Sequence, residues 1–545
     1  MADPETVPVI VGVGRFTQRK GVAIDDAYSP IDIMARTCRE AAQNATNSYY
    51  KAIHLLKSVE AVAVVQSATE TRAKRNFPTG ADCTISPNWP KSLGKSFGND
   101  IAGDRCFQTY DGGNSSQMLI NEMAEKIANG EFSSVIVSGC EVLSTLLKNV
   151  SEGKDQADYL RSKWSEEMKD CTPPRRIGPT YVSTEKETLH GLNVPVRAYP
   201  LMEQSYRGEL GLSVAEHMEK QSLLFSQFSQ IAAEQPEHSW FPVSRSMSEI
   251  ASPSSAGNKW VGFPYTKYHC AVMNVDQSAS VIIMSEAQAL RVGIPASKWV
   301  YLHGCADTYE KELLKRPKLH RSPAMKIMGE ELEKSSNLNL VRDIKYRDIY
   351  SCFPIAVSVL TNELGIVGKH GSDLTLTGGL PYHGGPGSNY SLHGVAALVS
   401  RLRADRGSFG LITANGGLIS KHSGGIYGTT PYSVTHPNAS RWTRKDPRLY
   451  QEYLNEGPEV PVSTAPAGMG RLESYTVIHK GNGKEYRAIC IGRLNDSNER
   501  FVAICNDDKL MKRLKEEDYL GHEVHVATND SGLSTFSERV VRSSL

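Results

Sequence analysis

The sequence lacks the features that mark several classes of protein. Its 545 residues include 61 basic and 60 acidic side chains, so a net charge of +1 provides no field to attract a polyanion such as DNA. Ten cysteines are present, but none stand in a CxxC motif, which argues against zinc sites, iron–sulfur clusters and a secreted disulfide framework. We therefore expect a protein of a reducing compartment, without a metal or a nucleic-acid partner.

Long hydrophobic runs are also missing. No stretch approaches the ~18 apolar residues of a membrane span, and the start, Met-Ala-Asp-Pro-Glu, has neither the basic nor the apolar part of a signal peptide. The last residues, Ser543-Ser544-Leu545, share the serine and leucine of a peroxisomal tripeptide but not its central basic residue. We expect a soluble, cytoplasmic protein, with a peroxisome or another organelle matrix as the alternative.

What the sequence does contain is an alternation of buried strands and helices. Apolar runs at 7–14, 61–65 and 134–138 predict strands, and Ser29-Pro30 predicts a helix start by N-capping. Gly112-Gly113 leads into a second helix, which begins at Asn114 and stops at Asn129-Gly130. Alternating strands and helices with short connections predict α/β layers with largely parallel sheets.

The same order recurs later in the chain. A strand at 299–303 is followed by a helix start at Ser322-Pro323, a strand ending near Tyr350, a glycine-flanked helix start at Asn389 and a strand at 409–413. The sequence therefore predicts two related halves, residues 1–145 with 262–297 and residues 298–430. Residues 146–261 are polar and irregular, and their length predicts a lid or binding loop domain rather than a linker.

The remainder divides into a tether and a small domain. Scattered prolines predict a linker over residues 431–470. Five strands, at 475–479, 486–491, 501–505, 523–528 and 536–541, with a short helix near 507–515, match the order of an OB-fold, so we expect an OB-like barrel over 471–545. Aromatic residues in its strands would suit single-stranded nucleic acid, but the domain shows no concentrated basic groove.

The two glycine-flanked helix starts carry the first functional signal. At Asn114 and Asn389 the free backbone N–H groups and the positive end of a helix converge on one point. Such a point can stabilise an anion or raise the thiolate fraction of a cysteine, although close packing of helix on sheet is the alternative explanation. Neither loop is a dinucleotide fingerprint or a P-loop, which disfavours Rossmann dehydrogenases and nucleotide hydrolases.

Four segments taken together resemble a thiolase, and more narrowly thiolase-like protein type 1, a sterol-carrier-type group with an additional C-terminal domain. They are GGNSSQMLINEMAEKIANGEFSSVIVSGCE (112–141), DIYSCFP (348–354), GGLPYHGGPGSNYSLHG (378–394) and TANGG (413–417). The resemblance implies a duplicated α/β/α/β/α core and an acetyl-CoA acetyltransferase or acyltransferase of lipid metabolism. It also implies coenzyme A or acyl-CoA as ligand, no covalently bound cofactor, and a monomer or homodimer.

The family's polar positions nevertheless depart from its pattern. The resemblance places the nucleophilic cysteine at Gly113 and the oxyanion-hole residue at Tyr350. It aligns the basic Gly-His-Pro triplet with Gly384-Gly385-Pro386, and the loop of the second cysteine with Ala414-Asn415-Gly416. A glycine cannot form an acyl-enzyme, and loss of both cysteines removes nucleophile and proton donor together. The family's own reaction is therefore doubtful.

Nearby groups could rebuild a residual chemistry, which leaves two hypotheses open. The candidate catalytic residues are Tyr350, Cys352, His383 and His422, although an inert buried cysteine and structural histidines are the plainer interpretations. The candidate ligand-binding residues are Gly113, Asn114, Arg175, Arg176, Gly385, Asn389 and Gly416, the two arginines for the phosphates of coenzyme A. The chain is then either an acyl-CoA-handling acyltransferase or a non-catalytic acyl-CoA or lipid carrier.

Overall fold

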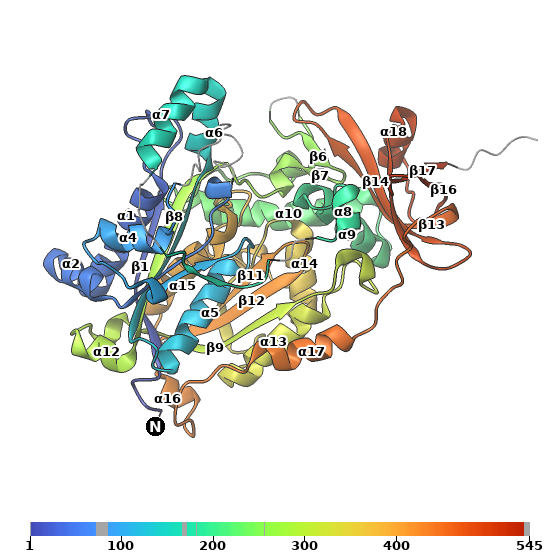
Figure 1. Cartoon of the computed structure of the whole chain (residues 1–545). Coiled ribbons are helices and arrows are strands. Elements are labelled where there is room, and N and C mark those ends of the chain that lie inside the picture. The colour runs from blue at the N-terminus through green and yellow to red at the C-terminus, as the bar shows by residue number, and fades with distance from the viewer. Residues whose placement is uncertain (1, 72–84, 166–171, 181–182, 255–256, 539–545) are drawn as a thin grey trace, which may run out of the picture.

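The computed structural model describes residues 2–71, 85–165, 172–180, 183–254 and 257–538, and its core consists of the two expected halves (Figure 1). Their strands form one continuous sheet in the order β10-β11-β12-β9-β1-β8-β4-β2-β3-β5, in which the halves meet where β1 pairs with β9. The first half contributes β1 (Pro8–Thr17), β2 (Ala61–Val64), β3 (Cys106–Thr109), β4 (Ser134–Val142) and β8 (Asp276–Ser285), with β5 (Arg175–Ile177) added at its edge. The second half contributes β9 (Val300–Tyr309), β10 (Ile344–Asp348), β11 (Phe409–Gly416) and β12 (Lys421–Gly428).

The expectation of largely parallel sheets is wrong for about half of the strand pairs. The pairs β4–β2, β2–β3, β3–β5 and β10–β11 are parallel, because a helical crossover separates most of these strands. The β8 strand pairs antiparallel with β1 and β4, and β12 pairs antiparallel with β11 and β9. Only residues 417–420 separate β11 from β12, which is a hairpin connection and can only produce antiparallel strands.

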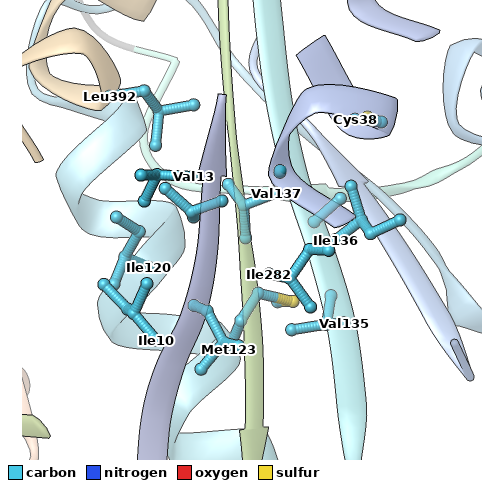
Figure 2. Packing of buried hydrophobic residues seen from close by; sticks show 14 of the residues in the cluster. Ile10, Val13, Cys38, Ile120, Met123, Val135, Ile136, Val137, Ile282 and Leu392 are labelled. Carbon is cyan, nitrogen blue, oxygen red and sulfur yellow. The ribbon is translucent and has the colours of Figure 1, made fainter. Parts of the chain in front are cut away.

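Helices cover the sheet on both faces. α1 (Pro30–Thr46) packs on β1, β8 and β4 together with α2 (Tyr49–Ser58) and α4 (Trp89–Ser96), and α13 (Pro323–Ser336) packs on β9 and β12. α5 (Ser115–Ala128) and α15 (Tyr390–Ala404) contact strands of both halves and each other. Figure 2 shows Ile120 and Met123 of α5 on one side of the strands and Cys38 of α1 on the other. The fold is therefore the expected layered α/β arrangement.

The duplication is visible in the helix starts. Ser29 and Ser322 both cap their helices by accepting a backbone N–H bond, and a proline follows each of them. Asn114 and Asn389, before α5 and α15, are both in a helical conformation and neither makes a side-chain cap. The second pair of helices therefore begins with backbone N–H groups that no capping side chain occupies.

The loop region is helical and is bound to its neighbours at both ends. It contains α6 (Leu143–Glu152), α7 (Lys154–Trp164), α8 (Glu185–Leu189), α9 (Pro195–Glu209), α10 (Val214–Ala233) and α11 (Met247–Ala251). Its β5 strand extends the first half, and β6 (Trp260–Gly262) pairs with β7 (Tyr265–Thr266) and with a strand of the tail domain. This region thus joins the core to the tail.

The tail is the expected OB-like barrel. It contains β13 (Gly468–His479), β14 (Glu485–Leu494), β15 (Arg500–Cys505), α18 (Asp508–Glu516), β16 (Glu523–Thr528) and β17 (Ser534–Glu538). The pairing β13-β14-β15-β17-β16-β13 closes the barrel, with β15 and β17 parallel. Residues 539–541 of the expected fifth strand lie outside the described residues.

Residues 431–470 are not a loose tether. They contain α16 (Tyr432–Thr435) and α17 (Pro447–Glu456), and the Trp442 side chain between these helices is buried. The Arg444 guanidinium lies 2.7 Å from Glu122, 2.8 Å from Glu125 and 2.7 Å from Asp307. The scattered prolines of this segment predict a linker. In the structure, Trp442 and Arg444 instead hold the segment against the core.

Within the described part of the chain, no helix is long and apolar enough to cross a membrane. The eight cysteines among the described residues are free and buried.

Candidate functional site

The start of α5 is closed by a tyrosine from the other half of the core. A Cβ at position 113 would lie 2.2 Å from the Tyr350 hydroxyl and 2.3 Å from the Asn415 carbonyl oxygen, closer than real Cβ contacts. Tyr350 is itself 6% exposed and therefore cannot easily move aside. A cysteine at position 113 does not fit beside this tyrosine, so the two departures from the thiolase pattern are physically coupled.

Gly416 and Asn114 complete this site. A Cβ on Gly416 would meet the Asn114 side-chain oxygen at 2.7 Å and the Gly113 nitrogen at 3.0 Å. In the described residues, the Asn114 Oδ1 and Asn415 Oδ1 atoms are buried without a hydrogen-bond partner. The structure thus brings together four of the expected residues, Gly113, Asn114, Tyr350 and Gly416, around polar atoms left unsatisfied.

Cys352 lies near this site but is a poor nucleophile. The Asn415 Nδ2 atom lies 3.9 Å from its sulfur, and Tyr199 stacks on Phe353 with ring centroids 4.4 Å apart. Burial raises the pKa of the Cys352 thiol to about 12, and the hydrogen bond with Tyr199 offsets only part of this. Because the thiolate is the reactive form, Cys352 is almost entirely unreactive at neutral pH.

His422 is not placed at the α5 start. Its Nε2 atom lies 3.3 Å from the hydroxyl of Ser322, the N-cap of α13, and burial lowers the pKa of the imidazole to about 3. The next residue, Ser423, lies 3.5 Å from Asn114. Successive side chains of a strand point to opposite faces, so His422 faces away from α5. Its expected catalytic role is therefore not supported by its position.

His383 lies in a buried group of rings behind Tyr350. Its ring centroid is 5.1 Å from that of His393 and 6.0 Å from that of Tyr390, which lies 5.5 Å from Tyr350. Burial lowers the pKa of His383 well below its usual value, so the ring is neutral. Two tyrosine rings separate His383 from Gly113, which places it too far away to activate a group there.

The second helix start is used for packing. The Asn389 amide donates to the Gly139 carbonyl at 2.7 Å, and a Cβ on Gly139 would lie 2.5 Å from Asn389 Oδ1. The Gly385 N–H donates to the Val272 carbonyl at 2.8 Å. The structure thus gives Asn389 and Gly385 neighbours on β4 and in the segment before β8.

Lys421 is a site residue that the sequence analysis missed. Its ammonium donates to the carbonyls of Asp111 at 3.1 Å and Pro179 at 3.2 Å, and the side chain is 2% exposed. Burial lowers its pKa. Lys421 pairs with Gly416 across the β11–β12 hairpin, which places it over the α5 start. Lys421 could have been identified from the sequence if the β11–β12 hairpin had been recognised there.

Arg175 and Arg176 lie on β5, at the outer edge of the first half. The Arg176 guanidinium donates to Gln66 Oε1 at 2.6 Å and to the Thr109 carbonyl at 3.0 Å, and Arg175 lies over the Phe107 ring at 5.0 Å. Both side chains are exposed. The segment continues to Pro179, which contacts Lys421, so these arginines lie on the strand that leads to the α5 start.

These features define a protein of the thiolase fold whose nucleophile position is closed. A model of the thiolase-like protein type 1 additional C-terminal domain matches residues 450–531. The crystal structure of a monomeric SCP2-thiolase-like protein type 1 from Mycobacterium smegmatis is 30% identical, covers 99% of this chain and 100% of its own, and has a TM-score of 0.79. The chain belongs to the SCP2-thiolase-like protein type 1 family.

More distant structures share the fold alone. An Ltp2–ChsH2(DUF35) aldolase is 16% identical with a TM-score of 0.54, over 78% of this chain and 98% of that one. The acetyl-CoA acetyltransferase from Syntrophomonas wolfei is 13% identical with a TM-score of 0.52, over 78% of this chain and 100% of that one. A comparison with curated proteins found no match.

Proposed function

We propose that this protein binds an acyl-CoA thioester, or an acyl lipid of similar shape, without carrying out the thiolase reaction. The single observation that carries the proposal is the contact between Tyr350 and Gly113, because it occupies the space from which a thiolase nucleophile would act. The fold and the family supply the expectation of a thioester ligand. Fold alone does not assign function, so the ligand has to be tested.

Several features of the closed site favour binding. The α5 start presents backbone N–H groups without a capping side chain, and such groups suit a thioester oxygen. Among the described residues, the side-chain oxygens of Asn114 and Asn415 have no partner, and they suit the amide N–H groups of a coenzyme A arm rather than the thioester oxygen itself. The exposed guanidinium groups of Arg175 and Arg176 suit phosphate groups at the rim.

An acyltransferase that uses Cys352 is the competing function. It would require the thiolate of a buried cysteine whose pKa is raised to about 12, with no acidifying cation among the causes of that shift. The position of His422 beside Ser322 removes one candidate base, and the distance of His383 from the α5 start disfavours another. The geometry therefore favours the binding protein over the enzyme.

Calorimetric titration with coenzyme A and acetyl-CoA tests the ligand. We expect saturable binding, weakened about tenfold or more in the Arg175→Gln/Arg176→Gln variant, as for lost charge-assisted hydrogen bonds to phosphate. Arg39→Gln is the control. It removes one exposed positive charge on α1, in a hollow between α1, α2 and α4, and should bind coenzyme A as the wild type does. The absence of binding at millimolar ligand would overturn the proposal.

Turnover assays separate binding from catalysis. Thiolysis and condensation should be undetectable in the wild type and equally undetectable in Cys352→Ala. Turnover that disappears in Cys352→Ala would show that an acyltransferase has been rebuilt around this cysteine.

A further inference from the structure

A second polar region lies away from the α5 start. It is a hollow of about 620 Å³ between the end of α10, the strand β10, the segment 372–376 and the outer turns of α15. Basic side chains outnumber acidic ones along its wall. The charged lining residues are Arg15, Lys345, Arg347 and Arg401 on the basic side and Glu234 and Asp373 on the acidic side.

The arginines of this hollow form no salt bridge in the described part of the chain, although the nearby charge of Asp348 opposes the lowering of the Arg15 pKa by burial, and that of Asp373 does so for Arg347. Lys345 is paired with Asp405 at 2.7 Å. Arg15 has only a long hydrogen bond, 3.4 Å, to the Gln235 amide oxygen, and Arg401 lies 5.7 Å from the Tyr346 ring. Neither arginine forms an ion pair with a carboxylate in the part of the chain that the structure describes.

Arg347 gives independent evidence for a ligand. Its side chain is 3% exposed and lines the hollow, and its Nη2 atom donates to the Leu340 carbonyl at 3.0 Å. Its Nε atom has no hydrogen-bond partner among the described residues. A buried guanidinium N–H is rarely left unpaired, so this atom indicates a missing acceptor.

Further unpartnered polar atoms lie deeper in the protein, on residues that are fully buried and do not line the hollow. His393 lies on α15 one turn before Ala397, which lines the hollow, so both are on the same face of the helix. All four ring nitrogens of His393 and His383 are buried without partners in the described residues, and their rings are 5.1 Å apart. Asp348 Oδ2 is also unpartnered there, and it faces the next residue of α15, since a Cβ on Gly394 would lie 2.5 Å from it.

This combination selects an anion. Three guanidinium groups in a partly enclosed hollow repel cations, and they match the oxygen geometry of a phosphate. Nowhere in the described ranges do three His, Cys, Asp or Glu side chains converge as they would to hold a metal ion. The same wall carries the apolar side chains of Ile231, Leu376 and Ala397, which suit the carbon skeleton of an organic ligand.

We propose that the hollow binds a phosphate monoester of a small organic molecule. Arg15, Arg347 and Arg401 hold the phosphate, and the organic part of the ligand contacts apolar lining residues such as Ile231, Leu376 and Ala397. The site is separate from the α5 start and does not depend on acyl-CoA binding there.

Titration with phenyl phosphate, and with inorganic phosphate for comparison, tests this site. We expect phenyl phosphate to bind more tightly than inorganic phosphate. Arg401→Gln changes an exposed position of α15 and should fold normally, and it should weaken binding of both probes about tenfold. Arg15→Gln should weaken it at least as much, and Arg15→Lys should restore part of the loss because it restores the charge.

Two controls locate the binding. Arg39→Gln, at a different hollow of about 340 Å³, should leave phosphate binding unchanged. Arg175→Gln/Arg176→Gln should also bind phenyl phosphate as the wild type does, and Arg401→Gln should keep its affinity for coenzyme A. Unchanged phenyl phosphate binding in Arg401→Gln and Arg15→Gln would overturn the proposal, and so would binding lost only in the Arg175/Arg176 variant.

Discussion

The α5 start and the hollow lined by Arg15, Arg347 and Arg401 both contain buried basic and polar groups, but these groups have different partners. At the α5 start the Tyr350 hydroxyl fills the position of a nucleophile, and Lys421 is satisfied by two carbonyls. At the hollow, within the described residues, Arg347 keeps a buried N–H group without a partner. The position of the family's nucleophile is filled, while a hollow that the family resemblance did not indicate is lined by basic side chains. A conserved fold therefore does not locate the functional site by itself.

Alkylation of Cys352 should show the largest difference. At pH 8 the reaction with iodoacetamide should be about a hundredfold or more slower in the folded protein than in the urea-unfolded chain, because a raised pKa leaves little thiolate. The folded rate should rise steadily with pH up to the limit of stability. Peptide mass spectrometry measures it. Equal rates in the two states would mean that Cys352 is an accessible, activated thiol.

Replacing Gly113 should destabilise the closed site. Gly113→Ala places a methyl group against the Tyr350 hydroxyl and the Asn415 carbonyl, and we expect a loss of about 1–3 kcal/mol in the free energy of unfolding by urea. Gly481→Ala is the matched control, since a Cβ there meets no atom within 4 Å. If both variants are equally stable, the space at Gly113 is not closed.

The pH dependence of stability should reveal the buried pair of histidines, His383 and His393. Burial lowers the pKa of His383 and of His393 in the folded state. At acid pH the unfolded chain therefore binds more protons than the folded chain does. Their contribution to stability is present above the unfolded pKa of about 6.5 and is lost as pH falls below it, by up to about 1.4 kcal/mol per pH unit for each ring.

The double variant His383→Gln/His393→Gln should flatten this acid slope. Urea unfolding at pH 7, 6 and 5 measures the slope. His422→Gln is the comparison: its ring is also buried, with a lowered pKa, and the substitution should flatten the slope by the share of one ring. An unchanged slope in the double variant would show that the pair is solvated or protonated in the folded protein.

The smallest effect concerns the coupling of positions 113 and 350. Tyr350→Phe removes the hydroxyl and should recover about 0.5–1 kcal/mol of the loss caused by Gly113→Ala, with the remainder due to the Asn415 carbonyl. A double-mutant cycle in urea measures this energy. Strict additivity of the two substitutions would show that the two residues do not interact.

Much of the fold follows from local sequence signals. The caps at Ser29 and Ser322 depend only on the residues beside them, and the order of the tail strands follows from alternation and turns. The ordered segment around Trp442 was not predicted, because it depends on contacts with a distant strand. The β11–β12 hairpin was missed although its short connection is local. Prolines and glycines indicate the local conformation of the chain, but they do not indicate which distant residues pack against it.

In the candidate site, the sequence predicted only the residues that align with the catalytic positions of the thiolase family. Gly113 and Tyr350 were identified separately, but their contact joins residues from different halves and appears only in three dimensions. The open hollow left no motif, since Arg15, Arg347 and Arg401 come from two strands and a helix far apart in sequence. Unsatisfied hydrogen bonds are a property of the folded chain and have no signature in composition.

Intact-mass spectrometry after incubation with acetyl-CoA or acetoacetyl-CoA tests the central claim most directly. Because Tyr350 fills the nucleophile position and Cys352 is protonated, the mass of the protein should stay unchanged at neutral pH. A covalent acetyl adduct that maps to Cys352 and is absent from Cys352→Ala would contradict the account.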